Sequence, residues 1–357
     1  MISLRDLRGA LPVDSGRVSV VGAGILLACF ASYCVAFAAL VTAENVWLKL
    51  FLAVVTGSSI GVLFVAGHDA SHGSLTRSEV ANRWLARLAF LPSAMPNETW
   101  DSEHNRQHHS WTNLTTKDPG YVPLSPEQYR QLNPWQRIWR RASFTLPGIG
   151  LAYIALWWEG GIRINPTRRD QIRSMPSYAL ECVLIAAFLG LQVAVVVAYG
   201  AWSSRGLGAF AAEALLCIAL PFYVWCWVMA FVTILHHTHP RIRWFDSEEE
   251  WLKAPRQFTS TVHVSWPKWF SVAFLWIFSH PAHHADKRIP MYRLDVAQHK
   301  LQEGFPEHAL VERGTFLHVV RVLKLCRLYD YRAHRWLDWD GRPTTESLIS
   351  TGSAEAT

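Results

Sequence analysis

Four stretches of the sequence contain no Lys, Arg, Asp or Glu: 18–43, 50–68, 182–204 and 214–240. A membrane-spanning helix needs about 20 consecutive apolar residues, and each stretch is long enough. Charged residues make up only 17% of the 357-residue chain, whereas they make up about 25% of an average soluble domain. We therefore predict an all-α integral membrane protein with four spanning helices, near 19–42, 47–66, 178–199 and 212–235.

Two shorter apolar segments need a separate interpretation. Residues 142–158 carry no charge, but they number only 17 and include Pro147 and Gly148, and residues 269–279 number only 11. Because both are shorter than a typical span, we expect them to lie at the membrane interface or to re-enter the membrane. The first long stretch is not a cleaved signal peptide, because the apolar region of such a peptide is only about 7 to 15 residues long.

With four spans, both termini, the loop 67–177 and the region 236–357 lie on one side of the membrane. Twelve Lys and Arg residues near the membrane ends fall on that side, and two, Lys49 and Arg205, fall on the other. Because loops rich in Lys and Arg stay in the cytoplasm, we predict a cytoplasmic helical cap on a single domain of residues 1–357. The pI near 9.1 then reflects this topology and an anionic membrane surface, not nucleic acid.

Histidine is the second unusual feature of the sequence. Residues three or four apart share one face of a helix, so a cluster of histidines can aim its imidazoles at one point. Neutral imidazole is the commonest metal ligand among side chains, and ionisable groups beside membrane helices are costly unless they have a function. Eleven of the 16 histidines form four such clusters, which together predict a metal site: His68 and His72; His104, His108 and His109; His236, His237 and His239; His280, His283 and His284.

The number of clustered imidazoles predicts two metal ions, because eight or nine exceed what one ion can use. A single site also requires that residues 142–158 do not cross the membrane, since only then do all clusters lie on one side. Imidazole suits Fe, Zn, Cu and Ni, which leaves the element open. The carboxylate-rich di-iron bundle is excluded, because its Glu-x-x-His pairs do not occur. We expect no metal role for the five isolated histidines, His263, His299, His308, His318 and His334.

Four motifs resemble the membrane fatty acid desaturase superfamily with its three histidine boxes: HDASH at 68–72, HNRQHH at 104–109, LHHTHP at 235–240 and HPAHH at 280–284. The resemblance covers about residues 47–300. It implies a non-haem centre of two Fe ions, O₂ as the oxidant and an acyl chain as the substrate. It also implies nine iron ligands in this sequence: His68, His72, His104, His108, His109, His237, His280, His283 and His284.

The HTHP motif leaves one ligand open. The family usually has Gln where His236 stands, so either His236 or His237 supplies the extra imidazole, and we favour His237. A carboxylate that accepts a ligand N–H fixes the ring and raises its basicity. Asp69 inside the first motif and Glu103 before His104 are candidates for this role. The segment TNLTTKDP at 112–119 resembles the polar stretch after the second box, and it adds Asn113 and Asp118.

Hydrogen removal from an unactivated methylene requires an oxidised metal, because no side-chain base abstracts such a proton near pH 7. The resemblance implies reductive activation of O₂ and formation of a C=C bond, with two electrons supplied per turnover. The chain has no Gly-rich dinucleotide fingerprint, no HPGG haem-domain signature and no iron–sulfur Cys spacing. We therefore expect a separate electron donor, such as a ferredoxin or a cytochrome with its reductase. We expect an acyl substrate, as free acid, thioester or lipid, and a place in a bacterial inner membrane.

Several alternative activities remain open at this point. The same site could hydroxylate, form an acetylenic bond, oxidise a carotenoid or decarboxylate a fatty acid to a terminal alkene. We favour desaturation because the second box and HTHP look most like those of acyl desaturases. A membrane zinc protease would need Glu where HDASH has Asp69. A haem electron carrier or metal transporter would place its histidines near mid-membrane, whereas these follow the predicted spans.

Overall fold

A computed structural model describes residues 4–11, 18–162, 172–202, 207–254 and 260–349 of the protein. Four apolar segments in it are long enough to cross a membrane, which confirms the four predicted spans. They are α2 (Ser19–Thr42), α3 (Val46–Ser71), α10 (Met175–Trp202) and a segment that ends in α12 (Leu220–His237). This last span begins in α11 (Leu207–Ala214) and passes through a π-helical turn, η5 (Leu215–Ala219), just before Pro221.

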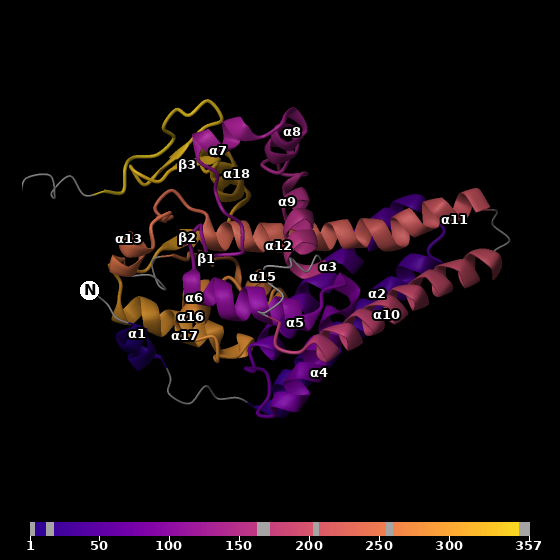
Figure 1. The fold of residues 1–357 in the computed structure, drawn as a ribbon. Coiled ribbons are helices and arrows are strands. Elements are labelled where there is room, and N and C mark those ends of the chain that lie inside the picture. The colour runs from indigo at the N-terminus through magenta and orange to yellow at the C-terminus, as the bar shows by residue number, and fades with distance from the viewer. Residues whose placement is uncertain (1–3, 12–17, 163–171, 203–206, 255–259, 350–357) are drawn as a thin grey trace, which may run out of the picture.

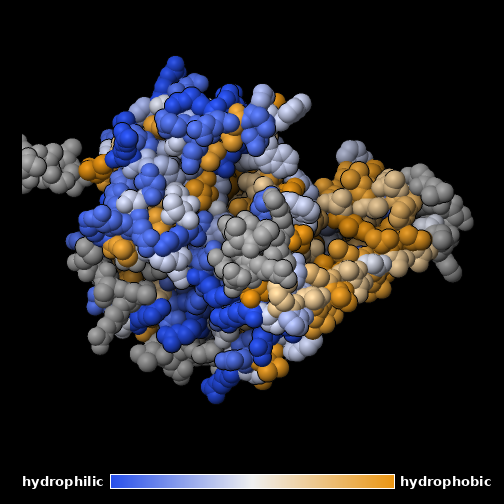
Figure 2. Space-filling model, in the orientation of Figure 1, coloured by the Kyte–Doolittle hydropathy of each residue, from blue (hydrophilic) through white to orange (hydrophobic). Residues whose placement is uncertain are grey.

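The far ends of these helices project together from the rest of the molecule (Figure 1). Figure 2 shows that this projection has a mainly apolar surface, whereas the opposite part is mainly polar. The helix α3 and the span that ends in α12 form the inner pair. Of their most apolar stretches, 56% and 50% of the residues are buried, against 28% for α2 and 11% for α10. The outer helices therefore present most of their apolar side chains to lipid.

Glycines bring α3 and α12 close together. A Cβ at Gly57 would lie 2.5 Å from the carbonyl oxygen of Pro221, and one at Gly61 would lie 2.7 Å from Cγ1 of Val228. Small residues are typical where membrane helices pack, because they let the backbones approach. The two helices that carry the first and third histidine clusters are thus held against each other.

The two shorter apolar segments are not among the helices long enough to span. Within 142–158 the chain turns and forms α9 (Ile149–Leu156), which continues as a π-helix, η3 (Trp157–Ile162). Side chains of α12 hold the start of this segment, because Tyr223 donates to the carbonyl of Pro147 and Trp227 donates to that of Leu146. Within 269–279 only the short helix α15 (Lys268–Ala273) forms.

The remaining elements form a cap at one end of α3 and α12 (Figure 1). The N-terminal helix α1 (Leu4–Ala10) lies there too, since Arg8 donates to the carbonyl of Ala285 at 3.1 Å. The cap helices are α4 (Glu79–Phe90), η1 (Leu91–Ser93), α5 (Asn97–Trp100), η2 (Asp101–His108), α6 (His109–Trp111), α7 (Pro126–Gln131), α8 (Pro134–Ala142), α13 (Glu248–Lys253), α16 (His280–Ala285), α17 (Met291–Gly304) and α18 (Phe316–Leu325).

Two small sheets add to the predicted all-helical fold. The strands β1 (His263–Ser265) and β2 (Val311–Arg313) pair in parallel, and β3 (Leu328–Asp330) and β4 (Arg335–Leu337) pair antiparallel. Each strand has only three residues, too few for an alternating apolar pattern to stand out in the sequence. Both sheets join segments of the C-terminal region to each other, and the fold remains mainly helical.

Candidate metal centre

Nine imidazoles from four distant parts of the chain converge in the cap, and they are the nine that the sequence pointed to. Within each of two groups, the candidate ligand atoms lie within 4.8 Å of one another. The first group contains His68, His72, His104, His109 and His283, and the second contains His108, His237, His280 and His284. The five isolated histidines belong to neither group.

Local helix geometry explains which histidine joins which group. His68 and His72 lie one turn apart at the end of α3, and they share a face. The second cluster lies on the π-helix η2, whose wider turn lets the N–H of His109 bond the carbonyl of His104, five residues earlier. As a result His104 and His109 face the first group, while His108 faces the second.

The expectation that each cluster aims at one point is therefore wrong for the second and fourth clusters, whose members divide between the groups, and for the third, of which only His237 joins a group. On α16, His283 joins the first group, while His280 and His284 join the second. The expectation assumed that one helix face serves one ion. In the structure a single short helix lies between the two groups and supplies both.

The nitrogen–nitrogen distances fit a metal in each group. In the first, Nε2 of His68 lies 2.9 Å from Nε2 of His104, and Nε2 of His109 lies 3.1 Å from that of His283. In the second, Nε2 of His237 lies 3.0 Å from Nε2 of His280. Two nitrogens bound about 2.1 Å from one ion are about 3.0 to 3.4 Å apart at angles of about 90° to 109°.

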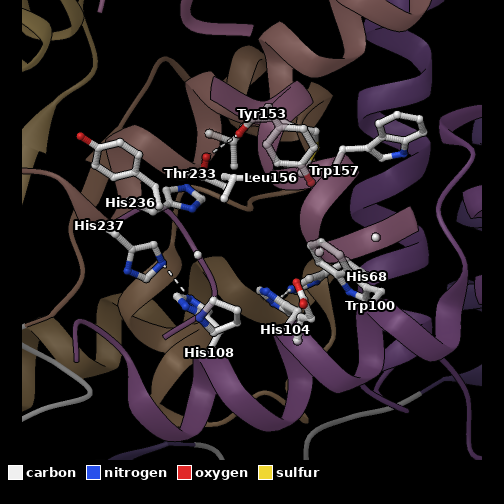
Figure 3. Close-up of a pocket in the computed structure, with 18 of the residues that line it drawn as sticks. His68, Trp100, His104, His108, Tyr153, Leu156, Trp157, Thr233, His236 and His237 are labelled. Atoms are coloured by element: carbon white, nitrogen blue, oxygen red, sulfur yellow. Dashed lines mark hydrogen bonds between the residues drawn. The ribbon is translucent and has the colours of Figure 1, made fainter. Parts of the chain in front are cut away.

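The hydrogen bonds on the outer side of the rings strengthen this fit. Nδ1 of His108 lies 2.9 Å from Oδ1 of Asp118, and Nδ1 of His237 lies 3.3 Å from the carbonyl oxygen of Ser260. Both neighbours are acceptors, so in the neutral form that binds metal each ring carries its proton on Nδ1 and has a lone pair on Nε2. These two lone pairs face each other at 3.2 Å (Figure 3). A bound cation relieves that repulsion.

Asp118 is itself held firmly. Its Oδ1 accepts from the backbone N–H of Gly120, and its Oδ2 accepts from that of Asn113, both at 2.9 Å. Burial alone would raise the pKa of this carboxyl, but His108 and the two N–H groups outweigh it and lower the pKa below its ordinary value of 3.8. Asn113 thus acts through its backbone, at a positive φ of 62°, and its side chain contacts no imidazole but donates to the carbonyl of Arg243.

Asp69 contacts the first group in a similar way. Its Oδ1 lies 3.3 Å from Nδ1 of His68, and its Oδ2 accepts from the backbone N–H of Met291. Trp100 stacks on His104 with ring centroids 4.4 Å apart. Both contacts fix an imidazole plane. The sequence did not suggest Trp100, although its position four residues before His104 on a helix was a signal for contact.

The imidazoles outside the spans are kept neutral, the state that binds metal. Burial, followed by the neighbouring rings, lowers the pKa well below 6.5 at His72, His104, His109, His280, His283 and His284. Nε2 of His284 is fully buried and has no hydrogen-bond partner among the residues described. An orphaned buried nitrogen in this position fits a metal ligand.

A largely apolar cavity runs beside the imidazoles (Figure 3). Its lining includes His68, His104, His108, His236, His237 and His280. Phe64, Met95, Leu156, Trp157 and Met229 supply much of the apolar wall. Glu103 also lines this cavity and lies against Gly160, where a Cβ would come within 2.0 Å of its Oε2. The metal site is thus open to a space suited to a hydrocarbon.

Fold and site together define an integral membrane protein that can hold metal ions beside an apolar cavity. The family described as fatty acid desaturase matches residues 45–316 of the chain, and the chain belongs to that family. It is therefore an oxidoreductase that acts on fatty acyl chains.

Named relatives match nearly the whole chain. The chloroplastic omega-6 fatty acid desaturase of Brassica napus is 26% identical over 358 residues, which cover 97% of this chain and 74% of the relative. An sn-1 oleoyl-lipid 12-desaturase from a Picosynechococcus species is 27% identical over 340 residues, or 92% of this chain and 90% of the relative. The corresponding enzyme of a Synechocystis species is 28% identical over 284 residues.

Proposed function

We propose that each imidazole group binds one iron ion and that the protein uses O₂ to insert a C=C bond into an acyl chain. The observation that carries this proposal is the pair of opposed Nε2 lone pairs on His108 and His237, next to an apolar cavity. Iron held by these imidazoles would supply the oxidising power that removal of hydrogen from a methylene requires. In each turnover, one O₂, two electrons and two protons are consumed, two hydrogens leave the chain and two waters form.

The side chains of the protein orient the ligands and exclude water from the reacting methylenes. Asp118 and Asp69 hold His108 and His68 through their Nδ1 atoms. Apolar lining residues such as Leu156 and Met229 hold the acyl chain by burial. His237 is our ninth ligand, since its Nε2 lies within the second group while His236 belongs to neither.

We propose that the substrate is an acyl chain esterified to a membrane lipid and that it already has one double bond. The names of the cyanobacterial relatives, sn-1 oleoyl-lipid 12-desaturases, support this choice, because those proteins match up to 92% of the chain. A free acid or a thioester would be the alternative form of the acyl group. The new double bond would lie on the methyl side of the existing one.

We further propose that the cap and both termini face the cytoplasm of a bacterium, with the spans in its inner membrane. The excess of Lys and Arg on the cap side supports this orientation. Electrons would come from a separate ferredoxin, or from a cytochrome with its reductase, that docks on the basic cap. An acidic carrier would be attracted to such a surface.

The test is expression in a host that makes monoenoic but no dienoic acyl lipids, with a ferredoxin and its reductase supplied. We expect new dienoic lipids, located by mass spectrometry, and about two Fe per purified chain. If hydroxylated, acetylenic or chain-shortened products appear and no diene does, the corresponding alternative activity replaces desaturation. One Zn per chain, or a haem absorption band, would overturn the di-iron centre.

A further inference from the structure

A second cavity lies between the spanning helices. It is bounded by α2, α3, α10 and the span that contains α12, and Thr56, Ile60, Leu189 and Phe222 are among the residues that line it. Both cavities follow the same inner helices: α3 supplies Phe64 to the first and Ile60 to the second, and α12 supplies Met229 and Phe222. A helix rises 1.5 Å per residue, so the second cavity lies about 6 to 10 Å farther from the imidazoles than the first cavity does.

Trp157 lies where the two cavities meet. It is the one residue, within the part of the chain that the structure describes, that lines both. Its indole Nε1 donates to the carbonyl oxygens of Ser93 and Ala94, at 3.1 and 3.3 Å, and its ring meets Phe222 edge-on at 4.9 Å between centroids. In Figure 3 the indole points away from the imidazoles. The ring is thus fixed at the junction.

The second cavity suits hydrocarbon and not a polar group. Its polar side chains are already paired: Gln192 donates to the hydroxyl of Tyr33 at 2.7 Å, and Thr56 donates to the carbonyl of Leu52 at 2.8 Å. An ester or headgroup there would lose its hydrogen bonds to water without replacement, which is costly. A chain that enters from the metal site toward this cavity must therefore lead with its methyl end.

We propose that Trp157 is the wall against which the methyl end of the acyl substrate stops. The distance from this wall to the imidazoles then sets how many carbons lie between the new double bond and the methyl end. Trp157 is a specificity-determining residue in this scheme, and the second cavity is the space that it closes to the methyl end of every chain. The inference rests on the proposed desaturase function.

The experiment supplies monoenoic chains of three lengths to cells that express the protein, and it locates each new double bond. In the wild type we expect the bond at one fixed distance from the methyl end for every length. Trp157→Ala joins the cavities and moves the bond away from the methyl end. Trp158→Ala is the matched control, because Trp158 is 50% exposed and lines neither cavity, and its products should equal those of the wild type.

Two further variants keep the test decisive. If Trp157→Ala does not accumulate, Trp157→Leu removes most of the ring and should move the bond in the same direction. Leu189→Trp fills the second cavity, so it should leave wild-type products unchanged and restore them in the Trp157→Ala background. If an active Trp157 variant leaves the position of the new double bond unchanged, the role of Trp157 is refuted and the proposed desaturase function still stands. A wild type that makes no diene overturns the proposed function instead.

Discussion

The ring of His236 stacks on that of His280, with centroids 3.8 Å apart and planes at 21°, yet His236 belongs to neither imidazole group. Its neighbour His237 has its Nε2 3.0 Å from Nε2 of His280. We therefore expect His236→Gln to retain both irons and His237→Ala to lose iron and activity. Elemental analysis of the purified variants checks this, and loss of iron from His236→Gln would make His236 the ligand.

Asp118→Asn should weaken iron binding by about 10- to 100-fold, the usual effect of losing a carboxylate that orients a ligand imidazole. The amide can present N–H to Nδ1 of His108 where the carboxylate accepted, which favours the wrong tautomer. Iron retention in a chelator titration measures the change. Asp340→Asn, at an exposed turn position, is the control. Equal retention in both variants would remove Asp118 from the site.

His284→Ala should abolish activity and lower bound iron, since it removes an imidazole from the second group of four. His318→Ala should do neither, although His318 is also buried in the cap. Its Nδ1 lies 4.0 Å from Glu312, and it joins no imidazole group. Iron per chain and diene yield, measured side by side, separate the two histidines. Full activity after His284→Ala would refute the ligand set.

His263 should make the protein sensitive to acid. Burial lowers its pKa from 6.5 to about 4, so between these values the unfolded chain binds a proton that the folded chain does not. The free energy of unfolding therefore falls as the pH falls, by about 2 kcal/mol between pH 7 and pH 5 for this residue. His263→Gln should show a smaller drop in thermal midpoint over that range.

The matched control for this pH effect is His299→Gln, because the side chain of His299 is 68% exposed. It should lose stability on acidification as the wild type does. An equal pH-dependent drop in the wild type and in His263→Gln would contradict the prediction.

The buried ion pair between Lys49 on α3 and Glu213 on α11 gives a stability prediction. Lys49 is 3% exposed, so Lys49→Met removes the buried counter-ion of the partly buried Glu213 carboxylate, which costs about 3 to 5 kcal/mol. The double variant Lys49→Met/Glu213→Leu should recover most of this loss. Thermal unfolding in detergent measures both.

The exposed pair of Lys253 and Glu249 supplies the comparison, with side chains 71% and 81% exposed. Lys253→Met should cost far less than Lys49→Met, because an exposed ion pair contributes little to stability. If the double variant at positions 49 and 213 were no more stable than Lys49→Met alone, loss of the ion pair would not be the cause of the destabilisation in Lys49→Met.

The spans and the histidine clusters could be predicted because both depend on residue type, and the family resemblance then implied which nine imidazoles are ligands. A run without charge such as 214–240 has few explanations other than a membrane helix. Four histidine clusters beside such runs likewise have few explanations other than a metal site. Asp69 followed from its place beside a ligand imidazole, where a carboxylate has a known role, whereas Asp118 was implied by the resemblance of residues 112–119 to the stretch after the second box.

The division of the site into two groups could not be predicted, because it depends on backbone geometry. The spacing of His104, His108 and His109 suggests one α-helical face, and only the π-helix η2 separates His108 from the others. The contact of Ser260 with His237 is made by a backbone carbonyl, so no side-chain pattern marks it. Trp157 resembles any of the 18 tryptophans until the two cavities beside it are known.

The sharing of η2 and α16 between the two imidazole groups also bears on biogenesis. Each group joins a spanning helix to the cap: the first includes His68 of α3 with His283, and the second includes His237 of α12 with His108. Bound ions would act as cross-links between segments more than 100 residues apart, and their binding energy would add to folding stability. The amount of folded protein in a cell should therefore depend on its iron supply.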